Sequence, residues 1–224
     1  MIHFKNMCKY YPTSNGRSYV FKDVNLSIPM DKSVAVLGPN GAGKSTLIRM
    51  IGGADIPSKG TIETSLNISW PLGLQGGLQG SMSGRENVRF VARIHGYKDT
   101  KMVEEKVAEF AEIGQYFNEP VKTYSNGMRA RVAFGLTMAF DFDFDVLLID
   151  ELNAVGDMAF RKKSESLLKE KYKQTKLIMV NHNLPQLKMF CESAILLGNQ
   201  TIQYIESIDD AIEQYKSDSH AKSS

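Results

Sequence analysis

The chain has 224 residues, of which 42% are hydrophobic and 23% are charged, and its formal net charge is +2. A chain of this length and composition can bury a core, and its near-neutral charge argues against nucleic acid as a partner. No apolar run approaches the roughly 18 residues that a membrane span needs, and no signal-peptide pattern opens the sequence.

The first part of the chain is predicted to be β-structure. Residues 20–28 form a β-run that leads into a short apolar strand over 33–37. Two cysteines, Cys8 and Cys191, lie beside apolar elements and far apart in the sequence. We expect both thiols to be reduced and buried, as in a cytosolic protein.

A glycine-rich loop follows the strand over 33–37 and precedes an apolar helix over 47–51. The loop residues are Gly38, Pro39, Asn40, Gly41, Ala42, Gly43, Lys44, Ser45 and Thr46. Glycines let the backbone turn its N–H groups toward phosphate oxygens, and the helix start adds the positive end of its dipole. Strand, loop and helix together predict a phosphate-binding loop. In such a loop Lys44 reaches the β- and γ-phosphates of a nucleotide, and Ser45 offers its hydroxyl to Mg²⁺.

The middle of the chain, from about residue 86 to residue 140, is predicted to be helical. Apolar residues recur at helical spacing over 86–94, 101–113 and 131–140. The first of these helices combines apolar and basic side chains, namely Val88, Phe90, Val91, Ile94, Arg85, Arg89 and Arg93. Either it faces the core and has a solvated basic face, or it borders a groove that receives a helix of a partner protein.

A polar segment over 123–129 leads into the helix over 131–140. Ser125 and the N–H groups at the helix start predict a second site for an anion. Taken alone, a serine in this place is an ordinary helix cap.

An apolar run over 146–149, which follows Asp145, ends in two adjacent carboxylates, Asp150 and Glu151. We predict a second buried strand of the parallel sheet, whose end places Asp150 near the magnesium ion. Glu151 lies one residue further, where a carboxylate can orient or deprotonate the water that attacks the γ-phosphate. A third apolar strand, over 177–180, is followed by His182, and a histidine at a strand end is commonly structural.

These motifs, in this order, resemble the ABC (ATP-binding cassette) ATPases over essentially the whole chain. Ser125 and Gly127 match two of the five residues of that family's signature loop, Leu-Ser-Gly-Gly-Gln in its commonest form. The resemblance implies that His182 contacts the γ-phosphate and that Asp157 belongs to the family's D-loop.

The resemblance also implies an aromatic ring that stacks on adenine. Tyr11 is the candidate and Tyr10 the nearby alternative, although a tyrosine in a first strand is otherwise a packed core residue. A glutamine that senses magnesium and water is implied as well. Gln75 and Gln79 both lie in a glycine-rich segment, and their spacing does not decide between them.

Softer stretches narrow the resemblance to bacterial ATPases that export capsular and other cell-surface polysaccharides, of the group 2, polysialic acid type. These stretches are residues 68–73, 79–88, 122–128 and 154–157. The implied fold is α/β, a P-loop NTPase cassette forming one domain over residues 1–216. It has a mostly parallel sheet core, an inserted helical subdomain at about 86–140 and an antiparallel β part. We expect the polar residues 217–224 to be disordered.

The resemblance implies ATP and Mg²⁺ as cofactors and a second copy of the chain as a partner. A signature loop does not reach the nucleotide of its own chain, so two copies face each other head to tail around two ATP molecules. Further implied partners are a transmembrane permease subunit and other envelope export components, with the chain peripheral on the cytoplasmic face of the bacterial inner membrane. The alternatives are the ATPase of another exporter and a non-transport ABC ATPase. A GTP-binding switch would need an Asn-Lys-x-Asp segment, which the sequence lacks.

Overall fold

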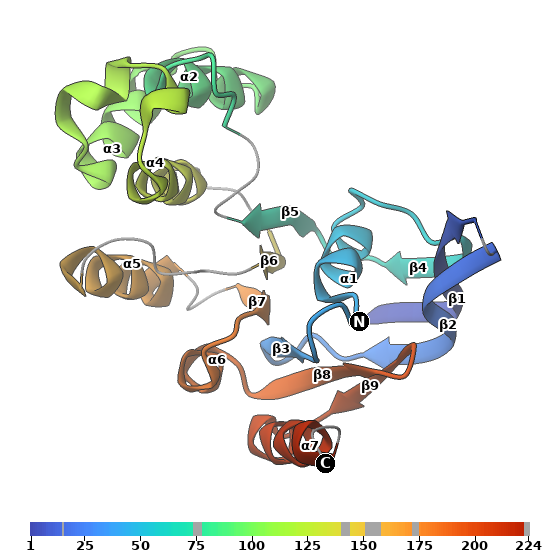
Figure 1. Cartoon of the computed structure of the whole chain (residues 1–224). Helices are drawn as coiled ribbons and strands as arrows, with labels where there is room; N and C mark the ends of the chain where they lie inside the picture. The colour runs from blue at the N-terminus through green and yellow to red at the C-terminus, as the bar shows by residue number, and fades with distance from the viewer. Residues whose placement is uncertain (15, 74–77, 140–143, 151–157, 172–174, 222–224) are drawn as a thin grey trace. The chain divides into compact units, whose positions relative to one another are not determined.

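The apolar runs of the sequence form the central strands of a six-stranded sheet (Figure 1). In spatial order its strands are β5 (Ile68–Gly73), β6 (Val146–Asp150), β7 (Lys176–Val180), β3 (Val34–Leu37), β8 (Ser193–Gly198) and β9 (Thr201–Ile205). Strand β3 pairs in parallel with β7 and β8, and β6 pairs in parallel with β7. Strand β9 returns antiparallel to β8. Parallel strands are covered on both faces, and accordingly every residue of β3 is buried.

The computed structural model describes residues 1–14, 16–73, 78–139, 144–150, 158–171 and 175–221. The chain divides into two compact units. The first contains residues 1–72, 143–152 and 172–224, and the second contains residues 73–142 and 153–171.

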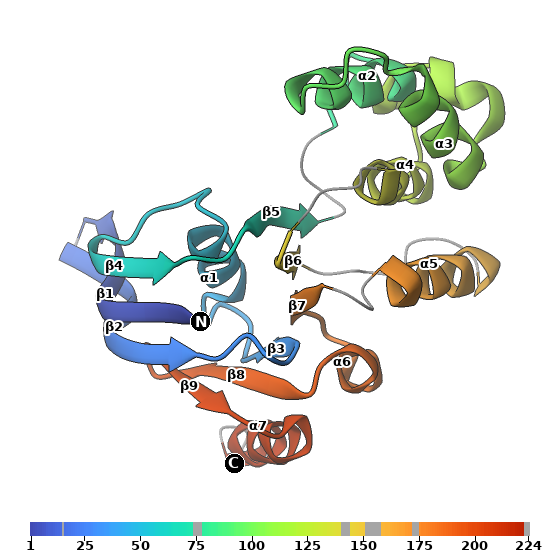
Figure 2. The same ribbon diagram turned by 180° about the vertical axis from the view of Figure 1, so that it is seen from behind.

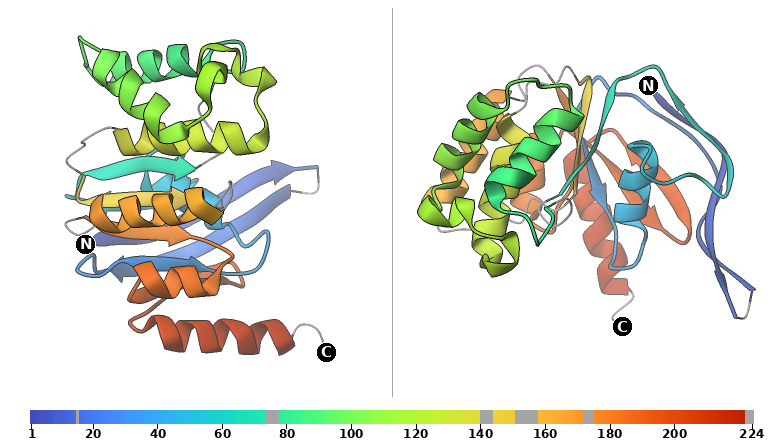
Figure 3. Two further views of the ribbon diagram at one scale, coloured as in Figure 1. Left: turned by 90° about the vertical axis from the view of Figure 1, so that its left-hand side faces the viewer. Right: turned by 90° about the horizontal axis from the view of Figure 1, so that it is seen from above.

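The first unit also contains a three-stranded antiparallel sheet in the order β2, β1, β4. Its strands are β1 (Ile2–Thr13), β2 (Gly16–Ile28) and β4 (Lys59–Thr64). Helix α1 (Lys44–Ile51) lies between the two sheets (Figure 3). One buried cluster joins the three elements, with Phe21 from β2, Leu47 from α1 and Leu148 from β6 among its members. The mostly parallel core and the antiparallel β part expected from the sequence are both confirmed.

Two further helices belong to the first unit, α6 (Leu184–Phe190) and α7 (Ile208–Ala221), and α7 packs on β8. Helix α7 continues through residues 217–221, which the sequence analysis had placed in a disordered tail. Ser217 Oγ donates to the Gln214 carbonyl at 2.8 Å, so this polar turn bonds to its own backbone. Cys8 and Cys191 are free and buried, as expected.

The second unit is helical (Figure 2). It contains α2 (Gly84–Ile94), α3 (Lys101–Ala111), the short 3₁₀ turns η1 (Gly114–Asn118) and η2 (Val121–Thr123), α4 (Asn126–Ala139) and α5 (Met158–Lys171). Its core takes Val88 from α2, Val107 from α3 and Val132 from α4. The unit thus contains the helices expected at about 86–140 and, in addition, α5. Among the described residues, no helix is long and apolar enough to span a bilayer.

Helix α2 buries only part of its apolar side chains. Val88 is buried, whereas Phe90 is 55% exposed and Ile94 is 63% exposed. The helix therefore faces the core of its unit and also presents two large apolar side chains to solvent.

Candidate functional site

Three parallel strands end next to one another at one edge of the six-stranded sheet. In the register of the sheet, Val36 of β3 and Asp150 of β6 both pair with Val180 of β7. The glycine-rich loop follows β3, Asp150 ends β6, and His182 comes two residues after β7. In open α/β sheets, ligands bind at this carboxyl edge. Residues from three distant parts of the sequence therefore meet where a site is expected.

The glycine-rich loop ends at Gly43, the residue that precedes α1. Gly43 has a φ of 95°, in the left-handed region that glycine favours. A Cβ atom on it would lie 2.4 Å from Val20 Cγ1 and 2.9 Å from Phe21 Cζ. Both the backbone conformation and the space therefore require glycine. The same contacts place the loop directly against strand β2.

The side chain of Lys44 contacts the backbone at the start of this loop. Its Nζ donates hydrogen bonds to the carbonyl oxygens of Gly38 at 2.8 Å and Pro39 at 3.0 Å. No side chain caps the start of α1 with a hydrogen bond. The positive end of the helix dipole and the ammonium group therefore both lie at the loop, an arrangement that attracts an anion.

Ser45 and Asp150, the two residues expected at the magnesium ion, are in contact. Ser45 Oγ donates a hydrogen bond to Asp150 Oδ1 at 3.3 Å. Ser45 is exposed and Asp150 is half-buried, so the pair is accessible to a ligand. A hydroxyl and a carboxylate are hard oxygen donors of the kind that Mg²⁺ prefers, and the pair fits that ion.

His182 is exposed in a turn held by its neighbours. Asn181 is buried, and its Nδ2 donates to Gln186 Oε1 at 2.8 Å. The Asn183 N–H donates to Asn181 Oδ1 at 2.8 Å, and the Asn183 side chain caps α6 by accepting from the Gln186 N–H at 3.2 Å. This network fixes the backbone on both sides of His182 at the carboxyl edge of the sheet.

The β1–β2 hairpin distinguishes Tyr11 from Tyr10. The Tyr10 ring is half-buried, lies 5.2 Å from the Tyr19 ring and carries the Arg17 guanidinium 4.7 Å from its centre. Tyr11 is 42% exposed. Because the Tyr10 ring already packs on Tyr19 and Arg17 within the hairpin, Tyr11 is the better candidate for stacking on a ligand.

Ser125 occupies the start of α4 in the second unit. Its Oγ accepts a hydrogen bond from the Met128 N–H at 3.2 Å, and the side chain is exposed. It is therefore a helix cap, as one of the two interpretations of the sequence held. A hydroxyl that accepts this bond keeps its own proton for a further acceptor. Gly127 follows in the first turn of the same helix and is half-buried.

The sequence analysis did not assign a role to the buried tyrosine beside this serine. Tyr124 is 5% exposed, and its hydroxyl accepts a hydrogen bond from the Gly84 N–H, the first of α2, at 3.0 Å. The commonest signature loop has leucine in this place. The phenol thus connects the Ser125 loop to the start of α2, a link that no sequence pattern indicates.

The two glutamine candidates are still not distinguished. Gln79 is exposed, and its backbone is held by Asn87, whose Oδ1 accepts from the Gln79 N–H at 2.6 Å. Gln75 lies outside the described residues, as do Glu151 and Asp157.

The sequence analysis also assigned no role to Glu104, a buried carboxylate between α2 and α3. Glu104 is 4% exposed and accepts hydrogen bonds from Arg89 at 2.8 Å, Arg85 at 3.2 Å and Thr100 at 2.8 Å. These bonds, the one from Arg89 first, lower the pKa of Glu104 from 4.5 to about 2. Arg85 and Arg89 therefore link α2 to α3, whereas Arg93 is exposed.

Comparison with known proteins gives consistent matches. Residues 21–154 match the family model described as "ABC transporter". The chain is 53% identical to the polysialic acid transport ATP-binding protein KpsT of Escherichia coli, over 96% of each chain. It is 43% identical to the ATP-binding protein BexA of Haemophilus influenzae, over 96% of this chain and 98% of the relative. It is 42% identical to the capsule polysaccharide export ATP-binding protein CtrD of Neisseria meningitidis, over 97% and 99%.

Solved structures agree on the fold. The dimeric ATP-binding cassette MJ0796, in a post-hydrolysis state bound to ADP and Pi, superposes with a TM-score of 0.74 at 23% identity. That match covers 93% of this chain and 99% of the other. A structure described as the ATP-binding subunit of an ABC transporter gives a TM-score of 0.74 at 20% identity, covering 96% of this chain and 93% of the other.

Proposed function

The chain belongs to the ABC transporter family, and from this membership we propose that it is the ATP-hydrolysing subunit that powers export of a capsular or other cell-surface polysaccharide. Export would run across the inner membrane through a separate transmembrane subunit. The hydrogen bond between Ser45 and Asp150, beside the glycine-rich loop, carries the proposal of nucleotide chemistry. The polymer class comes from relatives named for polysialic acid transport and capsule polysaccharide export.

ATP is held by its phosphates in the loop over residues 38–46. The backbone N–H groups and the start of α1 face the phosphate oxygens, and the Lys44 ammonium exchanges its carbonyl partners for the β- and γ-phosphates. Ser45 and Asp150 would hold Mg²⁺, which would supply positive charge against the phosphate oxygens.

Hydrolysis is an attack of water on the γ-phosphorus. Glu151 accepts the proton of the water as the new P–O bond forms, and the bond from the γ-phosphorus to the bridging oxygen of ADP breaks. His182, fixed by its turn at the sheet edge, contacts the γ-phosphate. Gln75 or Gln79 would contact the magnesium ion and the attacking water.

A second copy of the chain completes each site. Ser125, Gly127 and Asp157 act on the ATP bound by the opposite copy, in a head-to-tail dimer that closes on two nucleotides. The exposed Ser125 hydroxyl, with a proton to donate at the start of α4, supports this role. ATP binding thus closes the dimer and hydrolysis opens it, which is the mechanical output.

A transmembrane permease subunit receives that output, so the chain is peripheral on the cytoplasmic face of the inner membrane. We place the contact on the exposed face of α2, at Phe90, Arg93 and Ile94. Large apolar side chains exposed on a helix are typical of protein interfaces. Further envelope export components complete the pathway.

The second candidate is the ATPase of an exporter of another surface polymer. The chain is 34% identical to the O-antigen export system ATP-binding protein RfbB of Klebsiella pneumoniae, over 90% of this chain and 82% of the relative. It is also 34% identical to the teichoic acids export ATP-binding protein TagH of Bacillus cereus, over 96% of this chain and 42% of the relative. Both identities are lower than the 53% to the polysialic acid protein, which favours capsule export.

Complementation tests the proposal. The chain is expressed in two bacterial strains, one lacking the ATPase of a polysialic acid exporter and one lacking the ATPase of an O-antigen exporter. Antibodies against each polymer then measure its amount at the cell surface. We expect capsule to be restored and O-antigen not, with the Lys44→Ala chain inactive in both strains. Restoration of O-antigen alone would favour the second candidate.

A further inference from the structure

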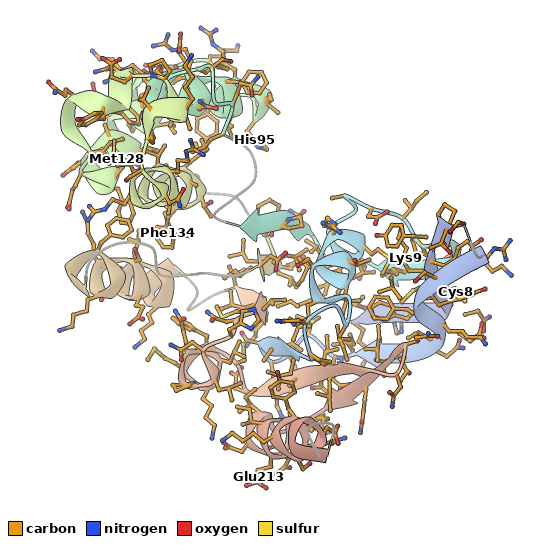
Figure 4. The ribbon with its side chains drawn as sticks, in the orientation of Figure 1. Cys8, Lys9, His95, Met128, Phe134 and Glu213 are labelled. Carbon is orange, nitrogen blue, oxygen red and sulfur yellow. The ribbon has the colours of Figure 1, made fainter. Side chains whose placement is uncertain are left out.

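Lys9 is a buried lysine on β1, two residues before Tyr11 (Figure 4). Its side chain is 8% exposed, and its Nζ donates to Asp55 Oδ1 at 2.6 Å and to the Ile56 carbonyl at 2.9 Å. The hydrogen bond from Lys9 holds the pKa of Asp55 below its ordinary value. A buried ammonium is costly unless it is paired, and these two acceptors fix its position.

The same ammonium lies over the ring of Tyr11. Lys9 Nζ is 5.2 Å from the centre of the ring, within the range of a cation–π interaction. Because the ion pair with Asp55 fixes the ammonium, the contact fixes the ring in turn. An exposed tyrosine without such a contact would sample several rotamers.

The strand that carries Lys9 and Tyr11 pairs with the strand that packs on the phosphate loop. Lys9 pairs with Phe21 across the hairpin, and a shift in the register follows between Lys9 and Tyr10. Phe21 and its neighbour Val20 both face the backbone of Gly43, at the end of the phosphate loop. Tyr11 lies two residues beyond Lys9 on the same strand and pairs with Ser18 of β2.

We infer that Lys9 is a positioning residue for Tyr11: its ammonium holds one face of the ring so that the other face is presented to the base of the nucleotide. This inference rests on the proposed role of Tyr11 in stacking on adenine. In this arrangement Lys9 contributes to recognition of the base and not to contact with the phosphates. The ion pair with Asp55, in the segment between α1 and β4, ties the base-recognising strand to the end of the phosphate-loop helix.

The experiment compares two ligands of the full chain, MgATP and magnesium tripolyphosphate, which has phosphates but no base. Calorimetry measures the dissociation constant of each. Lys9→Met keeps most of the side-chain length and removes the charge. We expect MgATP to bind about threefold to tenfold more weakly, as the loss of one cation–π contact allows. Binding of tripolyphosphate should stay within error of the parent chain, and Lys9→Arg should restore MgATP binding.

Two further variants separate positioning from general stability. Lys5→Met is the matched control, because Lys5 lies on the same strand and pairs with Glu63 at 2.5 Å, away from the ring. It should change neither dissociation constant. Lys9→Met combined with Asp55→Asn leaves no unpaired carboxylate, and it replaces the single variant if that variant melts early. The double variant should still bind MgATP more weakly than the parent chain, with unchanged binding of tripolyphosphate.

The Tyr11→Ala variant separates a failure of the inference about Lys9 from a failure of the proposed stacking role of Tyr11. In this background Lys9→Met should have no additional effect on MgATP, because the ring that it positions is gone. Equal weakening of both ligands, or the same loss with and without the ring, would overturn the inference and leave Lys9 a purely structural role. If Tyr11→Ala itself does not weaken MgATP relative to tripolyphosphate, the stacking role of Tyr11 is wrong and the inference falls with it.

Discussion

Ser45 Oγ lies 3.3 Å from Asp150 Oδ1, although 105 positions of sequence separate the two residues. The contact exists because β3 and β6 flank β7 in parallel and so end at the same edge of the sheet. The serine lies in the first turn of α1, which follows β3, and the aspartate ends β6. The contact thus joins the two halves of the expected magnesium site within one unit of the chain.

Removal of the Asp150 charge should weaken the binding of magnesium. In Asp150→Asn the amide keeps the size of the side chain but lacks the charge that attracts the ion. We expect the magnesium concentration needed for half-maximal ATPase activity to rise about tenfold or more, as loss of a charge-assisted contact implies. Asp145→Asn, at the other end of the same segment, is the control and should behave as the parent chain. Unchanged magnesium dependence in Asp150→Asn would remove this residue from the metal site.

Lys44→Ala should weaken nucleotide binding and hydrolysis together. Contacts to ionised phosphate are worth about 1.5–3 kcal/mol each, so the dissociation constant of MgATP should rise at least about tenfold. Calorimetry measures the change, with the exposed Lys59→Ala as a control. ATP affinity equal to that of the parent chain would contradict the assignment of the loop.

Glu151→Gln should separate binding from chemistry. The amide keeps the shape of the side chain but cannot accept the proton of the attacking water, so turnover should fall by roughly a hundredfold or more. ATP should still bind and, since it is not hydrolysed, should hold a homodimer together in size-exclusion chromatography. Normal turnover would mean that another residue is the base.

Mixed dimers test the composite site. Ser125→Arg damages the contribution to the opposite nucleotide, and Lys44→Ala damages binding in the same chain. A mixed dimer therefore has one site with both lesions and one site with neither. Its ATPase activity should lie well above that of either homodimer. If mixed dimers form and show no rescue, each site is complete within a single chain.

The ion-paired cluster on Glu104 changes how the surface of α2 should be tested. Arg89→Glu would place a second carboxylate against a buried one, so we expect it to destabilise the helical unit by about 1–3 kcal/mol. Arg93→Glu and Ile94→Asp alter only exposed side chains. They should abolish surface polymer while leaving the ATPase activity of the isolated chain intact. Normal surface polymer with both variants would exclude this face of α2 as the contact with the membrane subunit.

Acid should weaken the same cluster. The pKa of Glu104 is about 2 in the folded chain and lies below its ordinary value of 4.5. Stability from a lowered carboxyl pKa is fully present above the unfolded value and is lost as the pH falls toward the folded one. The melting temperature should therefore drop between about pH 5 and pH 2 more steeply in the parent chain than in Glu104→Gln. Parallel pH profiles would show that this carboxyl contributes little.

Local patterns in the sequence determined the strands, the loop and their order. The apolar runs at 34–37, 146–149 and 177–180 became buried parallel strands, because only near-continuous apolar sequence can be covered on both faces of a sheet. Gly43 was identifiable because the turn before α1 needs a positive φ. Helix α7 runs to Ala221, because a polar composition does not exclude a helix that continues from a docked segment.

Tertiary structure decided which residues are neighbours. It packed the Tyr10 ring on Tyr19 and left Tyr11 exposed, a choice that depends on the pairing of β1 with β2. It also brought Arg85 and Arg89 of α2 into ion pairs with Glu104 of α3, so that these two basic side chains link the helices. Contacts across long sequence separations depend on strand register and helix packing, and no local pattern records them. The sequence by itself therefore determined the family, the motifs and the order of elements, whereas the packing decided the roles of the remaining charged and aromatic side chains.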